Sequence, residues 1–242
     1  TLSPDGKTII YGVTKYDVAA NKGNMNLFAV PVKGGEPMQL TSMEGSEYDA
    51  QFTPDGSKIG FMHGGQLWEM NPDGTDAKQV TNVEGGFSSF KYAPAGDRIA
   101  IIKTVKLKDV SGADRYEDLP QSEALIYDDL MYRHWDSWNT GEFQHVFVGT
   151  YSNGEVSNLE DIMKDEPYDC PQKPFGGSED IAWHPSGTAL VYAAKKKEGV
   201  EYATSTNTDL YLYNVGSKST KNITTGMLGY DMHPSWSPDG TY

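Results

Sequence analysis

The stretch Phe52-Thr53-Pro54-Asp55-Gly56 is one copy of a five-residue motif that decides the fold of this chain. The motif is an apolar, mostly aromatic residue, then a small or polar residue, proline, a turn residue and glycine. The other copies are Leu2–Gly6, Tyr92–Gly96, Trp183–Gly187 and Trp236–Gly240. Proline fixes φ at the first corner of a turn, aspartate caps the turn, and glycine takes the left-handed position. Each copy therefore predicts a hairpin between two strands.

A second motif follows each of the first four copies and has the composition of a strand. These runs are Asn26–Val30, Gln66–Met70, His145–Gly149 and Asp209–Tyr213. Three of the four units then end in an apolar residue and threonine, namely Leu40-Thr41, Val80-Thr81 and Ile223-Thr224, whereas Leu159-Glu160 lacks the threonine. Each unit therefore supplies about four short strands, as expected for a repeated antiparallel sheet.

The spacing of the motif prolines indicates the architecture. Prolines 4, 54, 94, 185 and 238 are separated by 50, 40, 91 and 53 residues. Four short strands per unit of about 40–50 residues are typical of β-propeller blades, although a solenoid or a sandwich is the alternative. We therefore predict an all-β β-propeller with four blade units and the start of a fifth. The units span about 4–53, 54–93, 94–184 and 185–237, and the third carries an insertion over about 104–143.

The motif stands at both ends of the sequence, whereas a closed ring would need it at only one of the two ends. We therefore expect a piece of a larger ring, since propellers have about 4–8 blades. The alternative is a closed four-bladed ring, in which residues 235–237 pair with residues 7–13.

The insertion contains the one segment with helical spacing. Ala124, Tyr127, Met131, Trp135 and Trp138 follow one another at intervals of 3, 4, 4 and 3 residues. This spacing predicts a helix over 122–138, with Asp129 and Arg133 able to pair on its surface. Its aromatic face either docks the helix on its own blade or covers a pocket. In the second case Asp128, Asp129 and Asp136 face a substrate instead of solvent.

Composition excludes several classes of function. The chain has 20 lysine and arginine residues against 34 aspartate and glutamate residues, a net charge of −14. Such a charge disfavours binding to nucleic acids and to anionic lipid surfaces. No apolar run reaches membrane-spanning length. Cys170 is the only cysteine, which excludes an intrachain disulfide and a CxxC metal knuckle. We expect no metal site and no cofactor.

Catalytic motifs are missing from the sequence. There is no G-x-S-x-G elbow, because Gly86–Phe90 lacks the second glycine, and there is no HExxH, P-loop or G-x-G-x-x-G motif. We therefore predict no catalytic residue in this chain. The loops over 166–177 and 195–207 are expected to be irregular, and the three lysines 195–197 to form a solvated turn.

A weaker pattern concerns the entry of each blade. Asp49, Ser89 and Asp180 each precede a motif proline by five residues. The first strands of blades usually line the central channel, so Asp49 and Asp180 would form an acidic channel mouth that attracts a protonated amine. The alternative is that these residues cap the turns at which the strands begin.

The proline motifs resemble the propeller repeats of the prolyl oligopeptidase family and of TolB-like proteins. The insertion narrows this resemblance to bacterial serine peptidases of the dipeptidyl peptidase 5 type, which are also described as acylaminoacyl-peptidase-like. The strings that carry it are Tyr116–Pro120, Tyr127–Asp136, Pro174–Gly177 and Glu201–Asn207, and the resemblance covers essentially the whole chain.

The resemblance implies an N-terminal propeller that gates and seats substrate for a downstream α/β-hydrolase domain with a Ser-Asp-His triad. It implies release of dipeptides from peptide N-termini, a periplasmic or secreted location, and a peptide substrate as partner. In a related branch a glutamate pair on a short helix holds the substrate amine; the analogous acidic pair here is Asp128 and Asp129. We therefore select Asp128, Asp129, Arg133, Trp135 and Asp136 as candidate substrate-binding residues.

Other functions stay open from the sequence. The main alternative is a non-catalytic TolB-like propeller that binds a protein partner. A propeller glycosidase needs several arginines in its channel, and the chain has only Arg98, Arg115 and Arg133. The sequence also leaves open whether the protein forms a homodimer.

Overall fold

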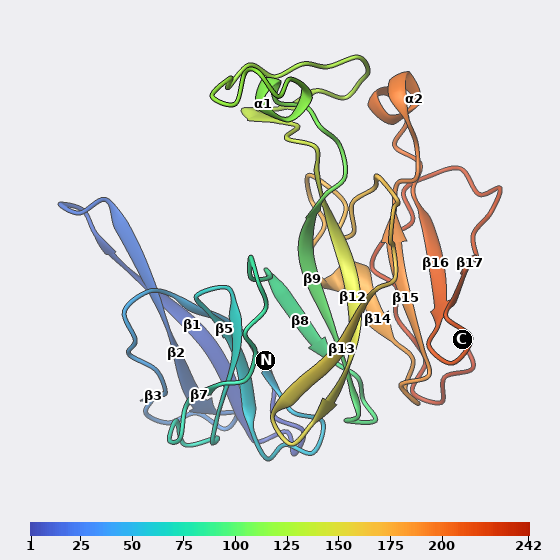
Figure 1. Ribbon diagram of the computed structural model, residues 1–242. Helices are drawn as coiled ribbons and strands as arrows, with labels where there is room; N and C mark the ends of the chain where they lie inside the picture. Colours follow the sequence, from blue (N-terminus) through green and yellow to red (C-terminus); the bar gives the residue numbers. More distant parts are fainter. The chain divides into compact units, whose positions relative to one another are not determined.

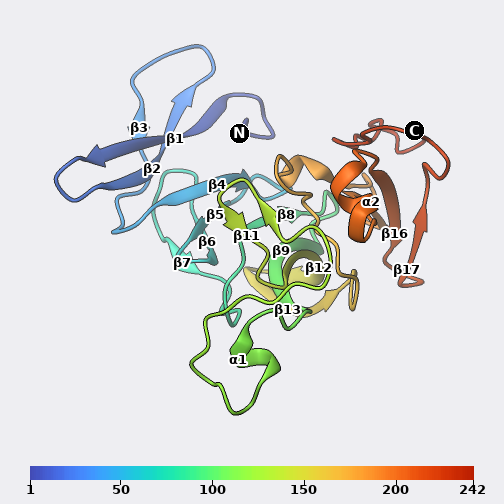
Figure 2. The same cartoon turned by 90° about the horizontal axis from the view of Figure 1, so that it is seen from above.

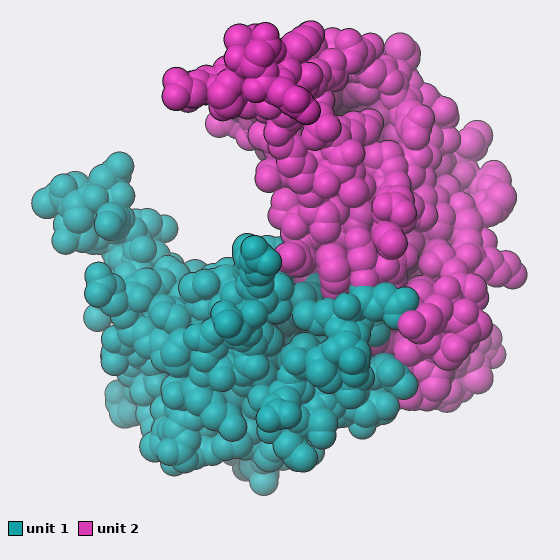
Figure 3. Space-filling model, viewed as in Figure 1, with its two compact units in different colours: residues 1–101, 148–160 teal, residues 102–147, 161–242 magenta.

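The computed structural model describes residues 1–242 and is almost entirely β (Figure 1). It divides into two compact units, coloured separately in Figure 3. Unit 1 comprises residues 1–101 and 148–160, and unit 2 comprises residues 102–147 and 161–242. No helix in the structure combines the length and the apolar character needed to cross a membrane.

Unit 1 contains two antiparallel sheets in which each strand pairs with the next along the chain. The first has the order β1 (Thr8–Asp17), β2 (Lys22–Pro31), β3 (Met38–Gln39). The second has the order β4 (Glu47–Phe52), β5 (Ile59–His63), β6 (Gln66–Met70), β7 (Lys78–Gln79). Their core consists of Ile10, Leu27, Ala29, Leu40, Ile59, Phe61 and Met70.

The third sheet has the order β8-β9-β12-β13, and the division between the units runs across it. Its strands are β8 (Ser89–Tyr92), β9 (Arg98–Lys106), β12 (Glu142–Ser152) and β13 (Glu155–Asp161). The fourth sheet lies in unit 2 and has the order β14 (Ile181–Trp183), β15 (Ala189–Ala194), β16 (Asp209–Asn214), β17 (Ser219–Asn222). Strand β15 is buried at every position, which fits its uninterrupted apolar sequence.

The proline motifs form the turns that the sequence predicts. The motif glycines at positions 6, 56, 96, 187 and 240 have φ between 70° and 78°, so a residue with a side chain is disfavoured there. In the second copy the Gly56 amide donates to the Thr53 carbonyl at 2.8 Å. The Thr53 hydroxyl donates to Asp55 at 2.7 Å, which ties the aspartate into the turn.

The threonine that ends three of the units has a defined bonding role. The hydroxyl oxygen of Thr41 accepts the Leu27 amide, and that of Thr81 accepts the Leu67 amide, each at 2.9 Å. Thr224 accepts the Leu210 amide at 3.0 Å in the same way. The threonine therefore accepts a hydrogen bond from a backbone amide of the strand two places earlier in the chain.

The predicted helix over 122–138 is wrong. The insertion between β9 and β12 instead contains the four-residue helix α1 (Gly112–Arg115) and a small hairpin of β10 (Arg133–His134) and β11 (Ser137–Trp138). Trp135 lies in the turn of this hairpin with φ 51°, which is incompatible with an α-helix. Arg133 donates to the Trp135 carbonyl at 2.7 Å, so the predicted pair with Asp129 is not formed.

Two further short helices belong to unit 2. They are the 3₁₀ turn η1 (Ser178–Asp180) and α2 (Gly199–Thr204), which precedes β16. Figures 1 and 2 both show α2 at one end of β16. Within unit 2, the insertion with α1 and the segment with α2 lie at the same end of the strands (Figure 1).

Candidate functional site

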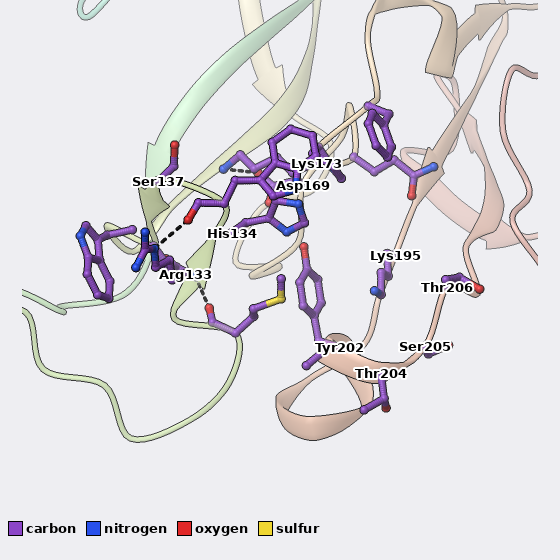
Figure 4. A pocket seen from close by; sticks show the side chains of 18 of the residues that line it. Arg133, His134, Ser137, Asp169, Lys173, Lys195, Tyr202, Thr204, Ser205 and Thr206 are labelled. Atoms are coloured by element: carbon purple, nitrogen blue, oxygen red, sulfur yellow. Dashed lines mark hydrogen bonds and ion pairs between the residues drawn. The ribbon is translucent and has the colours of Figure 1, made fainter.

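A cavity of about 770 Å³ lies within unit 2. It is lined by residues from three segments that are distant in sequence, 131–142 around β10 and β11, 169–175 and 195–206 with α2, and by Tyr230. Figure 4 shows Arg133 and His134 on one side of this cavity and Lys195 and Tyr202 on another. Its volume falls within the range of about 300–1,000 Å³ that is usual for small-molecule pockets.

Aromatic side chains form much of the cavity wall. The Trp135 and Phe175 rings meet edge to face with centroids 5.7 Å apart, although each residue is about two-thirds exposed. The Arg133 guanidinium lies 5.1 Å from the Trp138 ring centroid, within cation–π range. Large aromatic surfaces left open beside a cavity indicate a binding surface.

The loop over 162–177 is attached to β12 by partly buried hydrogen bonds. His145 on β12 contacts Asp161 through Nδ1 and the Glu166 carbonyl through Nε2, each at 2.8 Å. The Gln144 amide donates to Asp169 at 2.8 Å, and the Cys170 amide donates back to the Gln144 carbonyl at 2.8 Å. The strand therefore fixes the part of the loop that lines the cavity.

The segment before β16 supplies a lysine over an aromatic ring. Lys195 Nζ lies 4.5 Å from the Tyr202 ring centroid, and burial lowers the pKa of this lysine. Burial also raises the pKa of Tyr202 to about 12, so its hydroxyl stays protonated at neutral pH. The Tyr168 hydroxyl donates to Glu198 at 3.0 Å and so connects the beginning of α2 to the loop over 162–177.

Two of the five candidate substrate-binding residues, Arg133 and Trp135, line the large cavity. Asp128 and Asp129 line a separate hollow of about 350 Å³ in unit 2. Asp128 forms an ion pair with Arg115 at 2.7 Å, whereas Asp129 accepts only the adjacent Leu130 amide. Asp136 is exposed and lies outside both hollows.

The two residues of the predicted channel mouth belong to different units. Asp49 in unit 1 has φ 50° and accepts the Ser89 hydroxyl at 2.6 Å. Asp180 in unit 2 is fully buried, and its Oδ2 accepts the Gln172 amide at 3.3 Å. Burial raises the pKa of Asp180, which favours its protonated form more than in an exposed aspartate.

Gln172, Phe175, Lys195 and Tyr202 are among the cavity residues that sequence analysis did not select. All of them lie in segments expected to be loops, although Phe175 and Tyr202 fall within strings that carry the family resemblance. The three lysines 195–197 do not form a solvated turn. Lys195 covers the Tyr202 ring, Lys196 pairs with Glu166 at 2.6 Å, and Lys197 pairs with Glu201 at 2.7 Å.

The side chains of the chain do not form a metal-binding cluster: no group of three or more His, Cys, Asp or Glu residues has the required arrangement. Cys170 is fully buried, and burial raises the pKa of its thiol well above the usual value. A thiol held in this neutral form is a poor nucleophile. The chemistry that the cavity offers is therefore binding by aromatic rings, cations and hydrogen-bond donors.

Comparison with solved structures identifies the fold. The chain superimposes on acylaminoacyl peptidase from Pyrococcus horikoshii with a TM-score of 0.60 and 17% identity, covering 90% of this chain and 30% of that chain. A putative TolB from Agrobacterium tumefaciens gives a TM-score of 0.54 and 17% identity, covering 99% of this chain and 69% of that chain. With its repeated antiparallel sheets, the chain is therefore a β-propeller protein.

Sequence comparison identifies the relatives. No family model matches the chain. It is 43% identical over 243 residues to dipeptidyl-peptidase 5 from Porphyromonas gingivalis, covering 99% of this chain and 35% of that protein. It is 36% identical over 246 residues to dipeptidyl-peptidase 5 from Porphyromonas endodontalis, again covering 35% of that protein. The chain is thus a propeller region related to dipeptidyl-peptidase 5 and spans about a third of the length of these relatives.

Proposed function

We propose that this chain is the substrate-gating and substrate-seating propeller of a serine exopeptidase that releases dipeptides from peptide N-termini. The observation that carries this proposal is the 43% identity to the dipeptidyl-peptidase 5 of Porphyromonas gingivalis along 99% of the chain. On this proposal, an α/β-hydrolase domain elsewhere in the parent polypeptide supplies the catalytic triad and is the intramolecular partner of the propeller. The parent protein would act in the periplasm or outside the cell.

The cavity in unit 2 is suited to seating a short peptide. Trp135 and Phe175 offer apolar surface to a side chain, and the cationic residues around the cavity offer donors to carbonyl oxygens. A cavity of about 770 Å³ accommodates a few residues and not a folded protein. Binding there would restrict the enzyme to small peptides.

Asp129 is our candidate partner for the substrate amine. Its neighbour Asp128 is already neutralised by Arg115 at 2.7 Å, whereas no cationic side chain pairs with Asp129. A carboxylate is the natural partner for a protonated amine, because the charge-assisted bond is roughly twice as strong as a neutral one. Asp129 therefore has an unused charge available for an amine, and Asp128 does not.

The test is peptide hydrolysis by the full-length parent polypeptide. We expect it to cleave substrates with a free N-terminal amine, and we expect residues 1–242 alone to show no turnover. Asp129→Ala should raise KM about tenfold for free-amine substrates and should change KM much less for N-acylated ones. Asp136→Ala is the matched control, since Asp136 is exposed and lies outside both hollows.

Equal effects of Asp129→Ala on free-amine and N-acylated substrates would contradict the role of Asp129. A parent polypeptide without peptidase activity and without a hydrolase domain would contradict the whole proposal. A non-catalytic propeller that binds a protein partner would then be the better description. Cell fractionation of the source bacterium tests the proposed periplasmic or secreted location.

A further inference from the structure

The large cavity in unit 2 contains a buried hydrogen-bond donor that the protein leaves unused. Gln172 lines the cavity and is only 3% exposed, and its side-chain nitrogen Nε2 has no hydrogen-bond partner. Buried donors are almost always paired, because an unpaired buried polar group costs about 1–3 kcal/mol. An unpaired amide donor beside a cavity therefore points to an acceptor supplied by a ligand.

A second donor lies in the same cavity. The Lys195 ammonium has no carboxylate partner, and it lies 4.5 Å from the centroid of the Tyr202 ring. The other two cations of the cavity are engaged: Lys173 pairs with Asp169 at 3.0 Å, and Arg133 contacts Trp138 and the Trp135 carbonyl. Lys195 is therefore the cation that is available to a ligand.

The charge around the cavity differs from that of the whole chain. Three cationic residues line it, Arg133, Lys173 and Lys195, against two carboxylates, Glu142 and Asp169. Asp169 is occupied by Lys173 and by the Gln144 amide, and Glu142 accepts the Thr140 hydroxyl at 2.9 Å. In a protein with a net charge of −14, this cavity carries a small positive excess, which favours an anionic ligand.

The apolar part of the cavity constrains the ligand further. The exposed rings of Trp135 and Phe175 lie in the same cavity as the two unused donors. A ligand that uses all of these groups combines an apolar or aromatic side chain with a carboxylate. The C-terminal residue of a short peptide carries both groups on one Cα atom.

We infer that this cavity binds the C-terminal residue of a short peptide, with Gln172 and Lys195 holding its α-carboxylate and Trp135 and Phe175 contacting its apolar side chain. This inference rests on the proposed peptide-seating function, and it adds a requirement for a free C-terminus. Substrates of full protein length would be disfavoured because their C-termini lie far from the scissile bond.

The experiment is calorimetric titration of the full-length parent polypeptide with three probes: Gly-Phe, its C-terminal amide, and Glu-Phe-amide. The first carries the α-carboxylate, the second lacks it, and the third places a carboxylate on a side chain instead. We expect Gly-Phe to bind about ten- to a hundredfold more tightly than its amide, because a bond to a charged group is lost.

Two variants separate the donors. Lys195→Met should abolish the preference for the free acid while leaving the affinity for the amide unchanged. Gln172→Met should weaken both probes about two- to tenfold, because the amide oxygen of the second probe also accepts a hydrogen bond. Lys197→Met is the matched control, since Lys197 pairs with Glu201 and does not line the cavity. Circular dichroism tests whether each variant is folded. If Gln172→Met is misfolded, Lys195→Met alone tests the inference.

Equal affinity for Gly-Phe and its amide would overturn the inference. A loss of the preference for the free acid in Lys197→Met as large as that in Lys195→Met would also overturn it. Affinity of Glu-Phe-amide equal to that of Gly-Phe would also overturn it, because a side-chain carboxylate would then be the ligand. These outcomes are separable from failure of the proposed function. A parent that binds the free acid selectively but hydrolyses no peptide contradicts the peptidase proposal and leaves the binding site in place.

Discussion

The buried carboxylate of Glu69 offers a test of how unit 1 is stabilised. Glu69 lies on β6, is 2% exposed, and accepts the Tyr92 hydroxyl at 2.7 Å and the Tyr151 hydroxyl at 2.6 Å. Burial raises the pKa of both tyrosines, so each hydroxyl keeps its proton and donates at neutral pH. Glu69 therefore links the second sheet to residues of the third.

Tyr151→Phe removes one of these two bonds and little else. The Tyr92 and Tyr151 rings meet edge to face at 4.9 Å, and phenylalanine preserves that contact. A hydrogen bond to a charged group contributes about 1.5–3 kcal/mol, so we expect the free energy of unfolding to fall by that amount.

The double variant Tyr92→Phe/Tyr151→Phe should lose more than the sum of the two single variants. Each single variant leaves Glu69 one donor, whereas the double variant leaves the Oε1 of this buried residue with neither hydroxyl. Breaking all partners of a buried charge costs about 3–5 kcal/mol. The excess over additivity measures the coupling through the shared carboxylate.

The assay is thermal and urea unfolding of the parent polypeptide, followed by near-ultraviolet circular dichroism. Tyr16→Phe is the control in the same unit, because the Tyr16 residue is 78% exposed. Loss of less than about 0.5 kcal/mol in Tyr151→Phe, the range of neutral surface substitutions, would refute the reasoning. Strict additivity of the two tyrosine substitutions would equally show that Glu69 does not couple them.

Three further predictions follow from the sheets and turns. Gly60→Ala should lower the free energy of unfolding by about 1–3 kcal/mol in urea titrations, because the added methyl group would overlap the Tyr92 hydroxyl. The Thr53 hydroxyl lowers the pKa of Asp55 below its usual 3.8, so the Asp55 carboxylate stabilises the fold above about pH 4. This stabilisation is lost as the pH falls further. Asp55→Asn should therefore reduce the change of melting temperature with pH between pH 4 and pH 2. His145→Phe should both lower the melting temperature and weaken peptide binding, because the His145 side chain is buried and hydrogen-bonded. Trp135→Ala should weaken binding in calorimetry with little change in melting temperature, because Trp135 is exposed.

The turns and sheets could be predicted from the sequence because the forces that specify them are local. Each proline motif contains its own donors, acceptors and left-handed glycine within five residues, as the contacts of Thr53, Asp55 and Gly56 show. The runs after the motifs supply the next strands of the same sheets. Five copies of one local signal therefore carry the fold.

The error in the insertion has an identifiable cause. Helical spacing alone predicted one apolar face, but the side chains of Tyr127, Tyr132 and Trp138 instead stack on one another with centroids 5.7–6.3 Å apart. The Tyr127 hydroxyl also donates to the Asn139 carbonyl at 2.8 Å, which requires the segment to fold back on itself. An aromatic cluster and a hairpin thus prevail over a helix whose isolated stability would be marginal at this length.

The cavity could not be predicted because its residues come together only through tertiary contacts. Arg133 and Trp135 were found through a motif that carries a family resemblance, although the helix on which they were placed does not exist. Gln172 and Lys195 carry no local signal at all. Their importance appears only when the structure shows one buried donor without an acceptor and one ammonium without a carboxylate.

The hydrogen-bond donors of the cavity differ from those of the turns and of the Glu69 cluster. In the turns and at Glu69 every donor meets an acceptor within the chain, whereas Gln172 Nε2 and the Lys195 ammonium do not. Among the buried side-chain atoms without a hydrogen-bond partner, Gln172 Nε2 is the one donor, and the others are oxygen acceptors. The cost of leaving the buried Gln172 donor unpaired is recovered when a ligand supplies the acceptor, and this unpaired donor is the argument for a binding site.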